Sequence, residues 1–263
     1  MFHPLTMPLK RLMSLVLLFT ISTQLFAWGQ TGHRAIALIA TNHLDKKTKK
    51  ELFKIMGHES LMQASTWMDE IRSDDQWDHT HPWHYVTIPD GETYQTAEKN
   101  DKGDAVEAIE RMKAIVKDEN SSREEKRNAI RMLVHLIGDI HQPLHVGNGT
   151  DKGGNEVKIK WFYDKSNLHR IWDSEMIDSK QLSFTELAMF VDHPDENPIP
   201  NLRSTDVDVW IQEAIALRPQ VYDLTNEEYL SYEYMYKNWD TVSRQIEKAG
   251  IRLAEVLNEI LKS

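Results

Sequence analysis

Apolar residues recur at spacings of three and four over most of the chain, which is the period of an amphipathic helix. This pattern predicts helices over residues 31–44, 48–56, 60–71, 104–117 and 121–140. The last of these helices starts with the capping signal Ser-Ser-Arg-Glu-Glu. One face of it is apolar and carries Ile130, Leu133, Val134 and Ile137.

The second half of the chain begins with a segment of different composition. Residues 146–155 are rich in Gly and Asn and predict a loop, and the alternation over 156–163 predicts a strand within a small hairpin. Further helices are expected near Ser166, Ser183, Thr205 and Glu227, and a final long helix over 239–261. Residues 192–203, with three prolines, predict a polar loop. We find no repeat, and we expect a single, mainly α domain.

The first 27 residues have the features of a secretory signal peptide. Lys10 and Arg11 form the basic start, residues 12–26 are mostly apolar, and Ala27 is a small residue before the cut. Cleavage there leaves a domain of residues 28–263, which we expect in the periplasm or outside the cell, as a monomer without membrane contact. The alternative is an N-terminal membrane anchor.

Charge and cysteine content exclude several classes of function. The 263 residues contain 31 Lys and Arg against 41 Asp and Glu, and no cysteine. Disulfide frameworks, thiolate zinc fingers, iron–sulfur sites and cysteine nucleophiles are therefore excluded. A net charge of −10 argues against binding nucleic acid mainly by counterion release. It leaves open an enzyme whose positive charge comes from bound metal.

Two His–Asp pairs carry the candidate chemistry. His135 and Asp139, in LVHLIGDIHQPLH, are four residues apart and share a helical face, and His145 follows. A His–Asp hydrogen bond in the core would explain this pair alone equally well. The second pair, His169 and Asp173, repeats the spacing and favours a metal site. Imidazole and carboxylate ligands without sulfur are typical of hydrolytic zinc or manganese sites.

Further histidines and aspartates lie upstream, so the candidate set exceeds what one metal ion uses. They are His33 in WGQTGHR, Asp69 in ASTWMDEIR and His84 in HPWHYV. Two or three neighbouring ions indicate phosphate ester hydrolysis, in which the metals clamp the attacking and leaving oxygens.

Together these motifs resemble the zinc-dependent S1/P1 nuclease family. The chain has Trp28 with a His five residues later, Asp-x-x-Arg at 69–72, His-Tyr-Val at 84–86, Gly-Gly-Asn at 153–155 and both His-x-x-x-Asp pairs. The resemblance implies packed helices around a three-zinc cleft, a fold that the zinc phospholipases C share. It also implies hydrolysis of single-stranded DNA and RNA to 5′-phosphates, with 3′-nucleotidase activity. Because family members from plants and fungi carry disulfides, the lack of cysteine indicates a bacterial member.

The resemblance also implies how three Zn²⁺ ions would be held. One would have the ligands Asp69, His84, His135 and a bridging Asp139. Its neighbour would share Asp139 and add His33 with the free amino group and carbonyl oxygen of Trp28. The third would be held by His145, His169 and Asp173.

Substrate contacts are implied in the same way. Asp69 would orient the nucleophile and Arg72 would contact the scissile phosphate. Tyr85 would stack on a base, and Gly153 and Asn155, with the Gly between them, would line the base pocket. Some relatives have an Asp where this chain has Thr87, which puts base preference in doubt.

Two other functions remain as alternatives. A zinc phospholipase C would share the N-terminal Trp, but the five-residue spacing to His33 and the use of Asp173 instead of Glu favour a nuclease. A non-catalytic zinc-binding module would need no Arg72 beside the metals.

Overall fold

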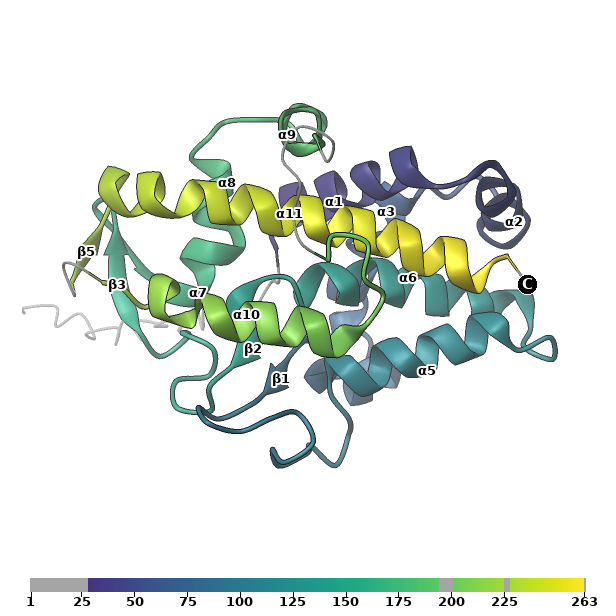
Figure 1. Cartoon of the computed structure of the whole chain (residues 1–263), viewed down its shortest axis with the longest axis horizontal. Helices are drawn as coiled ribbons and strands as arrows, with labels where there is room; N and C mark the ends of the chain where they lie inside the picture. The colour runs from purple at the N-terminus through teal and green to yellow at the C-terminus, as the bar shows by residue number, and fades with distance from the viewer. Residues whose placement is uncertain (1–27, 194–200, 225–227, 263) are drawn as a thin grey trace, which may run out of the picture.

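Three helices form the centre of the molecule. The computed structural model describes residues 28–193, 201–224 and 228–262. Within them, α11 (Tyr232–Ile260) runs along the whole molecule and packs on α1 (Gln30–His43) and α6 (Arg123–Asp139) (Figure 1). Gly250 permits the close approach of α11 to α1, because a Cβ there would lie 2.6 Å from Ile39 Cβ. The predicted class, a mainly α fold, is confirmed.

The start of α6 follows the predicted capping signal. Ser122 accepts a hydrogen bond from the backbone of Glu125, whose carboxylate accepts one from the Ser122 backbone. From Ala129 onward the helix is almost entirely buried, and α5 (Ala105–Lys117) packs beside it. The far end of α6 is therefore deep in the protein.

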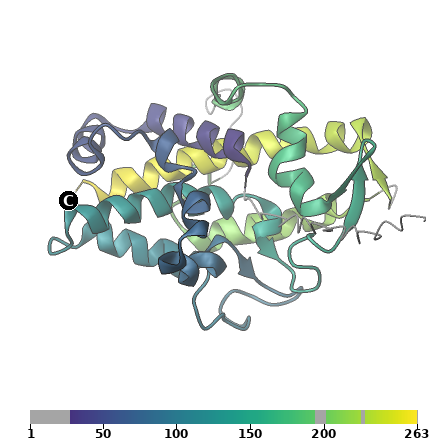
Figure 2. The same cartoon turned by 180° about the vertical axis from the view of Figure 1, so that it is seen from behind.

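The segment before α5 is more broken than its pattern predicts. After α2 (Lys46–Met56), the single helix predicted over 60–71 is wrong: α3 (Leu61–Ala64) and α4 (Trp67–Glu70) are separate. The break leaves the carbonyl of Ser65 free to accept a hydrogen bond from His135. Two 3-10 helices follow, η1 (Ile71–Ser73) and η2 (Asp75–His84). Figure 2 shows this dark blue segment lying across α6.

Two small sheets complete the frame of the site. Strands β1 (Val86–Thr87) and β2 (Val146–Gly147) pair in parallel, and each begins within two residues of a candidate histidine, His84 or His145. The predicted hairpin is present as β3 (Lys158–Trp161) and β4 (Asp164–Asn167), with β5 (Tyr229–Leu230) on the other edge of β3.

Three of the remaining helices begin within two residues of their predicted starts: α7 (Leu168–Arg170), α9 (Phe184–Val191) and α10 (Val207–Val221). The 3-10 turn η3 (Pro143–His145), a π-helical turn (Ile171–Glu175) and α8 (Met176–Asp178) had no predicted start. The final helix begins at Tyr232, seven residues before the predicted start at 239. The start predicted near Glu227, the middle of the predicted loop 192–203 and the predicted signal peptide 1–27 lie outside the described residues.

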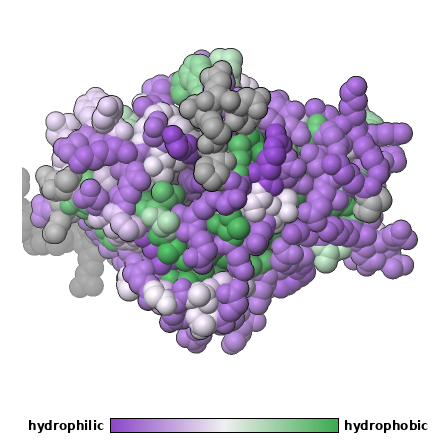
Figure 3. Space-filling view, in the orientation of Figure 1, coloured by the Kyte–Doolittle hydropathy of each residue, from purple (hydrophilic) through white to green (hydrophobic). Residues whose placement is uncertain are grey.

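The surface is mostly hydrophilic on the face drawn in Figure 3. An apolar patch lies over α9, where Met189 and Phe190 are exposed. Among the described residues, no helix combines the length and apolar composition that crossing a bilayer requires.

Candidate functional site

The buried end of α6 carries the first group of candidate ligands. His135 Nε2 lies 3.4 Å from Asp139 Oδ2, as their four-residue spacing predicts. His33 comes from α1: its Nε2 lies 3.2 Å from Asp139 Oδ1. The His33 ring stacks on His135 with centroids 4.1 Å apart. All three side chains are completely enclosed.

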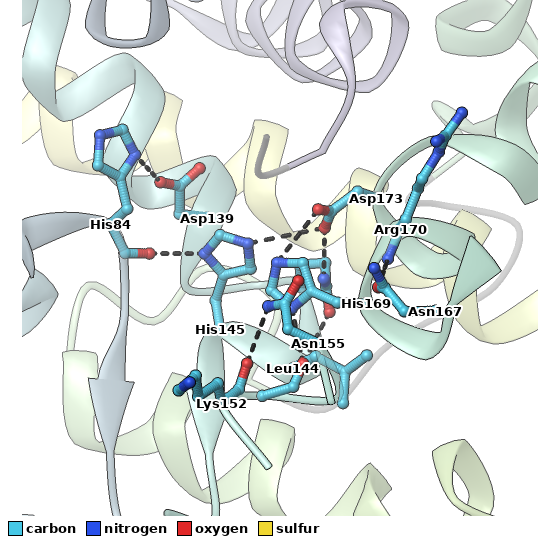
Figure 4. Close-up of polar contacts among 12 residues, drawn as sticks. His84, Asp139, Leu144, His145, Lys152, Asn155, Asn167, His169, Arg170 and Asp173 are labelled. Atoms are coloured by element: carbon cyan, nitrogen blue, oxygen red, sulfur yellow. Dashed lines mark hydrogen bonds and ion pairs between the residues drawn. The ribbon is translucent and has the colours of Figure 1, made fainter. Parts of the chain in front are cut away.

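His84 and Asp69 complete this group from a different part of the chain. His84 Nδ1 lies 2.9 Å from Asp139 Oδ2, as Figure 4 shows. Asp69 Oδ1 lies 3.8 Å from His135 Nε2. Asp139 is thus contacted by imidazoles on both carboxylate oxygens, and Asp69 joins the group through His135.

A second group lies beside the first and consists of His145, His169 and Asp173 (Figure 4). Asp173 Oδ2 lies 3.1 Å from His169 Nε2, and Asp173 Oδ1 lies 3.6 Å from His145 Nε2. His169 is in α7, but Asp173 is in the π-helical turn that follows. The pair therefore meets across a local widening of the helix, which is a feature common at functional sites.

Backbone carbonyls fix the orientation of three of these rings. The Nδ1 of His135 donates to Ser65 O over 2.7 Å. The Nδ1 of His145 donates to His84 O, and that of His169 to Gly153 O, each over 2.6 Å. Because a carbonyl only accepts, Nδ1 carries the proton and Nε2 keeps its lone pair. A buried imidazole held in this way presents Nε2 as a metal ligand.

Both groups fit metal ions in their donor atoms, and the first group also fits them in its charge. Several donor atoms are buried without a hydrogen-bond partner among the described residues: His33 Nε2, His84 Nε2, His145 Nε2, Asp69 Oδ1 and Asp139 Oδ1. Burial, and then the carboxylates of Asp69 and Asp173, raise the pKa of Asp139 well above its usual value. Burial also lowers the pKa of His33 and His84. Neutral imidazoles around crowded carboxylates are what bound cations require.

The position of Trp28 is set by contacts around the first turn of α1. Its side chain is fully buried, and the next residue, Gly29, donates its backbone N–H to Asp173 O over 2.6 Å. Gly32 leaves room for this packing, because a Cβ there would lie 2.9 Å from Trp28 Cβ. The main chain at Trp28 is thereby held beside the segment that carries Asp173.

A cleft of about 380 Å³ opens over both groups. Arg72, Tyr85, Thr87, Gly153 and Asn155 line it together with three of the candidate histidines, His84, His145 and His169. Arg72 NH1 lies 3.8 Å from Asp69 Oδ1, and Tyr85 is 43% exposed. All the residues that the sequence singled out are therefore in the two groups, in the cleft or, for Trp28, beside them.

Comparison with known proteins identifies the family. The family model for S1/P1 nuclease matches residues 28–262. The chain belongs to the S1/P1 nuclease family. It is 30% identical to Endonuclease 4 of Arabidopsis thaliana over 90% of each chain. It is 25% identical to Nuclease P1 of Penicillium citrinum over 89% of this chain and 97% of that one. To Nuclease S1 of Aspergillus oryzae it is 31% identical over 57% of this chain and 55% of the relative.

Membership makes this protein a nuclease that hydrolyses phosphodiester bonds, in a family that is zinc-dependent. It also favours the nuclease over the two alternatives weighed from the sequence, the phospholipase C and the non-catalytic module. Among the described residues, three sets of these side chains could each hold a metal ion: two sets within the first group, which share His135, and the second group itself.

Some residues that shape the site of this nuclease carry little signal in the sequence. Gln142 is fully buried and donates to Asp173 Oδ1 over 2.5 Å. Arg218 of α10 donates to the carbonyls of Ile88, Val146 and Gly147, and so holds β1 against β2. Only the tertiary structure reveals these contacts, since each joins residues far apart in the chain.

Gly138 did offer a signal. Glycine inside a helix lowers helix stability by about 1 kcal/mol relative to alanine. A glycine directly before Asp139 therefore indicates a packing requirement. A Cβ at Gly138 would lie 2.8 Å from His33 Nδ1. The glycine makes room for the His33 ring between α1 and α6.

Proposed function

We propose that this chain is a secreted or periplasmic zinc-dependent endonuclease that hydrolyses single-stranded DNA and RNA to 5′-phosphate products and also acts on 3′-nucleotides. The observation that carries the proposal is that candidate metal ligands and candidate substrate contacts line the same cleft. His84 of the first group and His145 and His169 of the second line it, together with a guanidinium (Arg72) and an exposed aromatic ring (Tyr85).

The proposal assigns three Zn²⁺ ions to the site. Asp69, His84, His135 and Asp139 would hold the first. Asp139, His33 and the free amino group and carbonyl of Trp28 would hold the second, and His145, His169 and Asp173 the third. When bound, zinc lowers the pKa of a water molecule and neutralises charge on phosphoryl oxygens.

Asp69 and Arg72 would act directly on the substrate. Burial raises the pKa of Asp69, and its Oδ1 has no hydrogen-bond partner among the described residues. In the proposed role this carboxylate orients the attacking water in line with the scissile P–O bond. Arg72 would donate to the phosphoryl oxygens, where a guanidinium offsets the negative charge that develops in the transition state.

The walls of the cleft would explain a preference for single strands. Tyr85 offers a ring on which a base can stack, and Gly153 and Asn155 line the same cleft. A base that is already stacked and paired in a duplex would first have to leave its helix, and this costs free energy. Unpaired strands and 3′-nucleotides avoid that cost.

Processing of the chain belongs to the same proposal. Residues 1–27 would act as a signal peptide, and cleavage after Ala27 would release a monomeric nuclease domain of residues 28–263. The new N-terminus would supply the α-amino group of Trp28 to the second zinc ion.

An activity panel tests the function directly. Purified mature protein is assayed on single-stranded DNA, duplex DNA, RNA, 3′-AMP and phosphatidylcholine, with and without a chelator. We expect chelator-sensitive hydrolysis of the single strands and 3′-AMP, little of the duplex and none of the lipid. Hydrolysis of the lipid alone, or activity that survives complete metal removal, would contradict the proposal.

A further inference from the structure

Three arginines form a stripe along the exposed side of α6, outside the cleft. Arg123, Arg127 and Arg131 follow each other at four-residue spacing, and the buried candidate ligand His135 comes four residues later on the same helix. Four residues of helix rise about 6 Å, which is close to the spacing of successive phosphates along an extended strand. We call these three residues the α6 arginine stripe. It leads along one helix to the candidate metal site.

Each arginine of the stripe is held on its inner side. Arg123 Nε donates to Ile55 O over 3.0 Å, and Arg127 NH2 donates to Met56 O over 2.8 Å. Arg131 makes two 2.8 Å hydrogen bonds to the carboxylate of Glu59. The contacts to Ile55 and Met56 cap the end of α2, and all of these contacts fix the arginine side chains, so that little rotamer freedom would be lost on binding.

The inner contacts leave other donors unused. Among the described residues, Arg123 donates through Nε and Arg127 through NH2, whereas Arg127 Nε lies 3.6 Å from Glu59 Oε2. A groove of about 380 Å³ lies over the stripe and is lined by the three arginines, Glu124 and Asn128. Three arginines against Glu59 and Glu124 leave one net positive charge here, on a chain whose total is −10. The groove therefore offers guanidinium N–H groups suited to an anion.

Two aromatic rings connect the stripe to a segment that borders the cleft. The Arg131 guanidinium lies 5.0 Å from the centroid of the Trp67 ring, and Trp67 meets Trp77 edge-to-face with centroids 5.2 Å apart. Both rings are partly exposed. Trp77 belongs to η2, the same short helix that places His81 on the cleft. Cationic groups alternating with aromatic rings are typical of surfaces that bind single-stranded nucleic acid.

We propose that the α6 arginine stripe, with Trp67 and Trp77, is a second binding site for the backbone of a single-stranded polynucleotide whose cleaved bond lies in the cleft. The proposal rests on the proposed function and adds to it: affinity increases with strand length because phosphates beyond the cleft contact Arg123 and Arg127. Short substrates occupy the cleft alone and make no use of the stripe.

The test compares long and short substrates in the mature, zinc-loaded protein. The double variant Arg123→Gln with Arg127→Gln is assayed on a single-stranded thymidine dodecamer and on 3′-AMP. We expect KM for the dodecamer to rise about tenfold at low salt, and the slope of log affinity against log salt to fall by about 1.4, for two lost phosphate contacts. Turnover of 3′-AMP stays unchanged.

Matched variants separate this effect from general charge and from folding. Lys237→Gln with Arg244→Gln removes the same charge from α11. Helix α11 faces the viewer in Figure 1, whereas the α3–α4 segment, whose Trp67 contacts Arg131, faces the viewer in Figure 2. It should leave the dodecamer KM unchanged. Arg123→Lys with Arg127→Lys keeps the charge and should restore most of the binding.

Each contrary outcome has a distinct meaning. If the double arginine variant lost as much activity on 3′-AMP as on the dodecamer, the proposed role of the stripe would be wrong. The same holds if the α11 variant raised the dodecamer KM equally. If the wild type cleaved neither substrate, the proposed function would fail. Binding of a phosphorothioate dodecamer, followed by fluorescence anisotropy in the wild type and all three variants, would then still decide the stripe: equal affinities reject it.

Discussion

The side-chain amide of Gln142 donates a 2.5 Å hydrogen bond to Asp173 Oδ1, and both groups are buried. The oxygen of the same amide accepts the backbone N–H of Leu144, so the amide cannot rotate freely. Gln142 thereby joins the turn that carries His145 to the π-helical turn that carries Asp173. It orients a candidate ligand without being one.

Replacing Gln142 with Ala should weaken the third zinc site selectively. Partners that orient metal ligands typically contribute 10- to 100-fold in metal affinity, so we expect about one zinc ion fewer per chain after dialysis against a weak chelator. The control is Gln245→Ala, since Gln245 is also buried but donates to His141 O. Equal zinc content in the two variants would show that Gln142 has no role in holding metal.

Asp139 is the side chain on which the first group depends. Asp139→Asn keeps its shape but removes the charge that two zinc ions would share. We expect both neighbouring ions to be lost and hydrolysis to be abolished, while circular dichroism still shows a helical protein. Three zinc ions in the variant with a nearly normal rate would contradict the bridging assignment.

Tyr85 should act on substrate binding rather than on the chemical step. Tyr85→Ala removes a stacking surface worth about 1–3 kcal/mol per base, which we expect as a higher KM for a dinucleotide with little change in kcat. Tyr163→Ala is the control, because Tyr163 is 87% exposed and lies outside the cleft. Similar kinetics in both variants would remove Tyr85 from the binding site.

Trp28 links processing to activity. A free α-amino group has a pKa near ~8 and can lose its proton to a metal, whereas an amide nitrogen within the chain is a poor ligand. Protein with an uncleaved Met before Trp28 should therefore bind fewer zinc ions and be nearly inactive. Removing that Met by an aminopeptidase should restore zinc content and activity. Zinc analysis and N-terminal sequencing of both forms provide the measurement, and a fully active Met-extended form would disprove the link.

Local patterns were enough to predict much of the helical frame. The capping box at Ser122 and the apolar face of α6 follow from residues within one or two turns of each other. The approach of His135 to Asp139 is likewise a consequence of helical geometry. Such features are determined by short-range sterics and hydrogen bonding between residues that are close in the sequence, and they can therefore be predicted from it.

The local pattern did not predict where the helices are interrupted. The pattern over 60–71 is helical throughout, yet the chain breaks between α3 and α4 and gives the Ser65 carbonyl to His135. The π-helical turn at Asp173 is a similar case. In both places a contact with a distant segment competes with the local helical hydrogen bonds.

The sequence by itself determined the family, the mainly α class and the set of histidines and aspartates in the candidate site. The tertiary structure decided how those side chains divide into groups, because His33, His84 and Asp139 meet only through the packing of α1 and η2 on α6. It also decided the parts played by Gln142 and the α6 arginine stripe. Contacts between distant segments depend on how the helices pack, and a local pattern of residues carries no record of that packing.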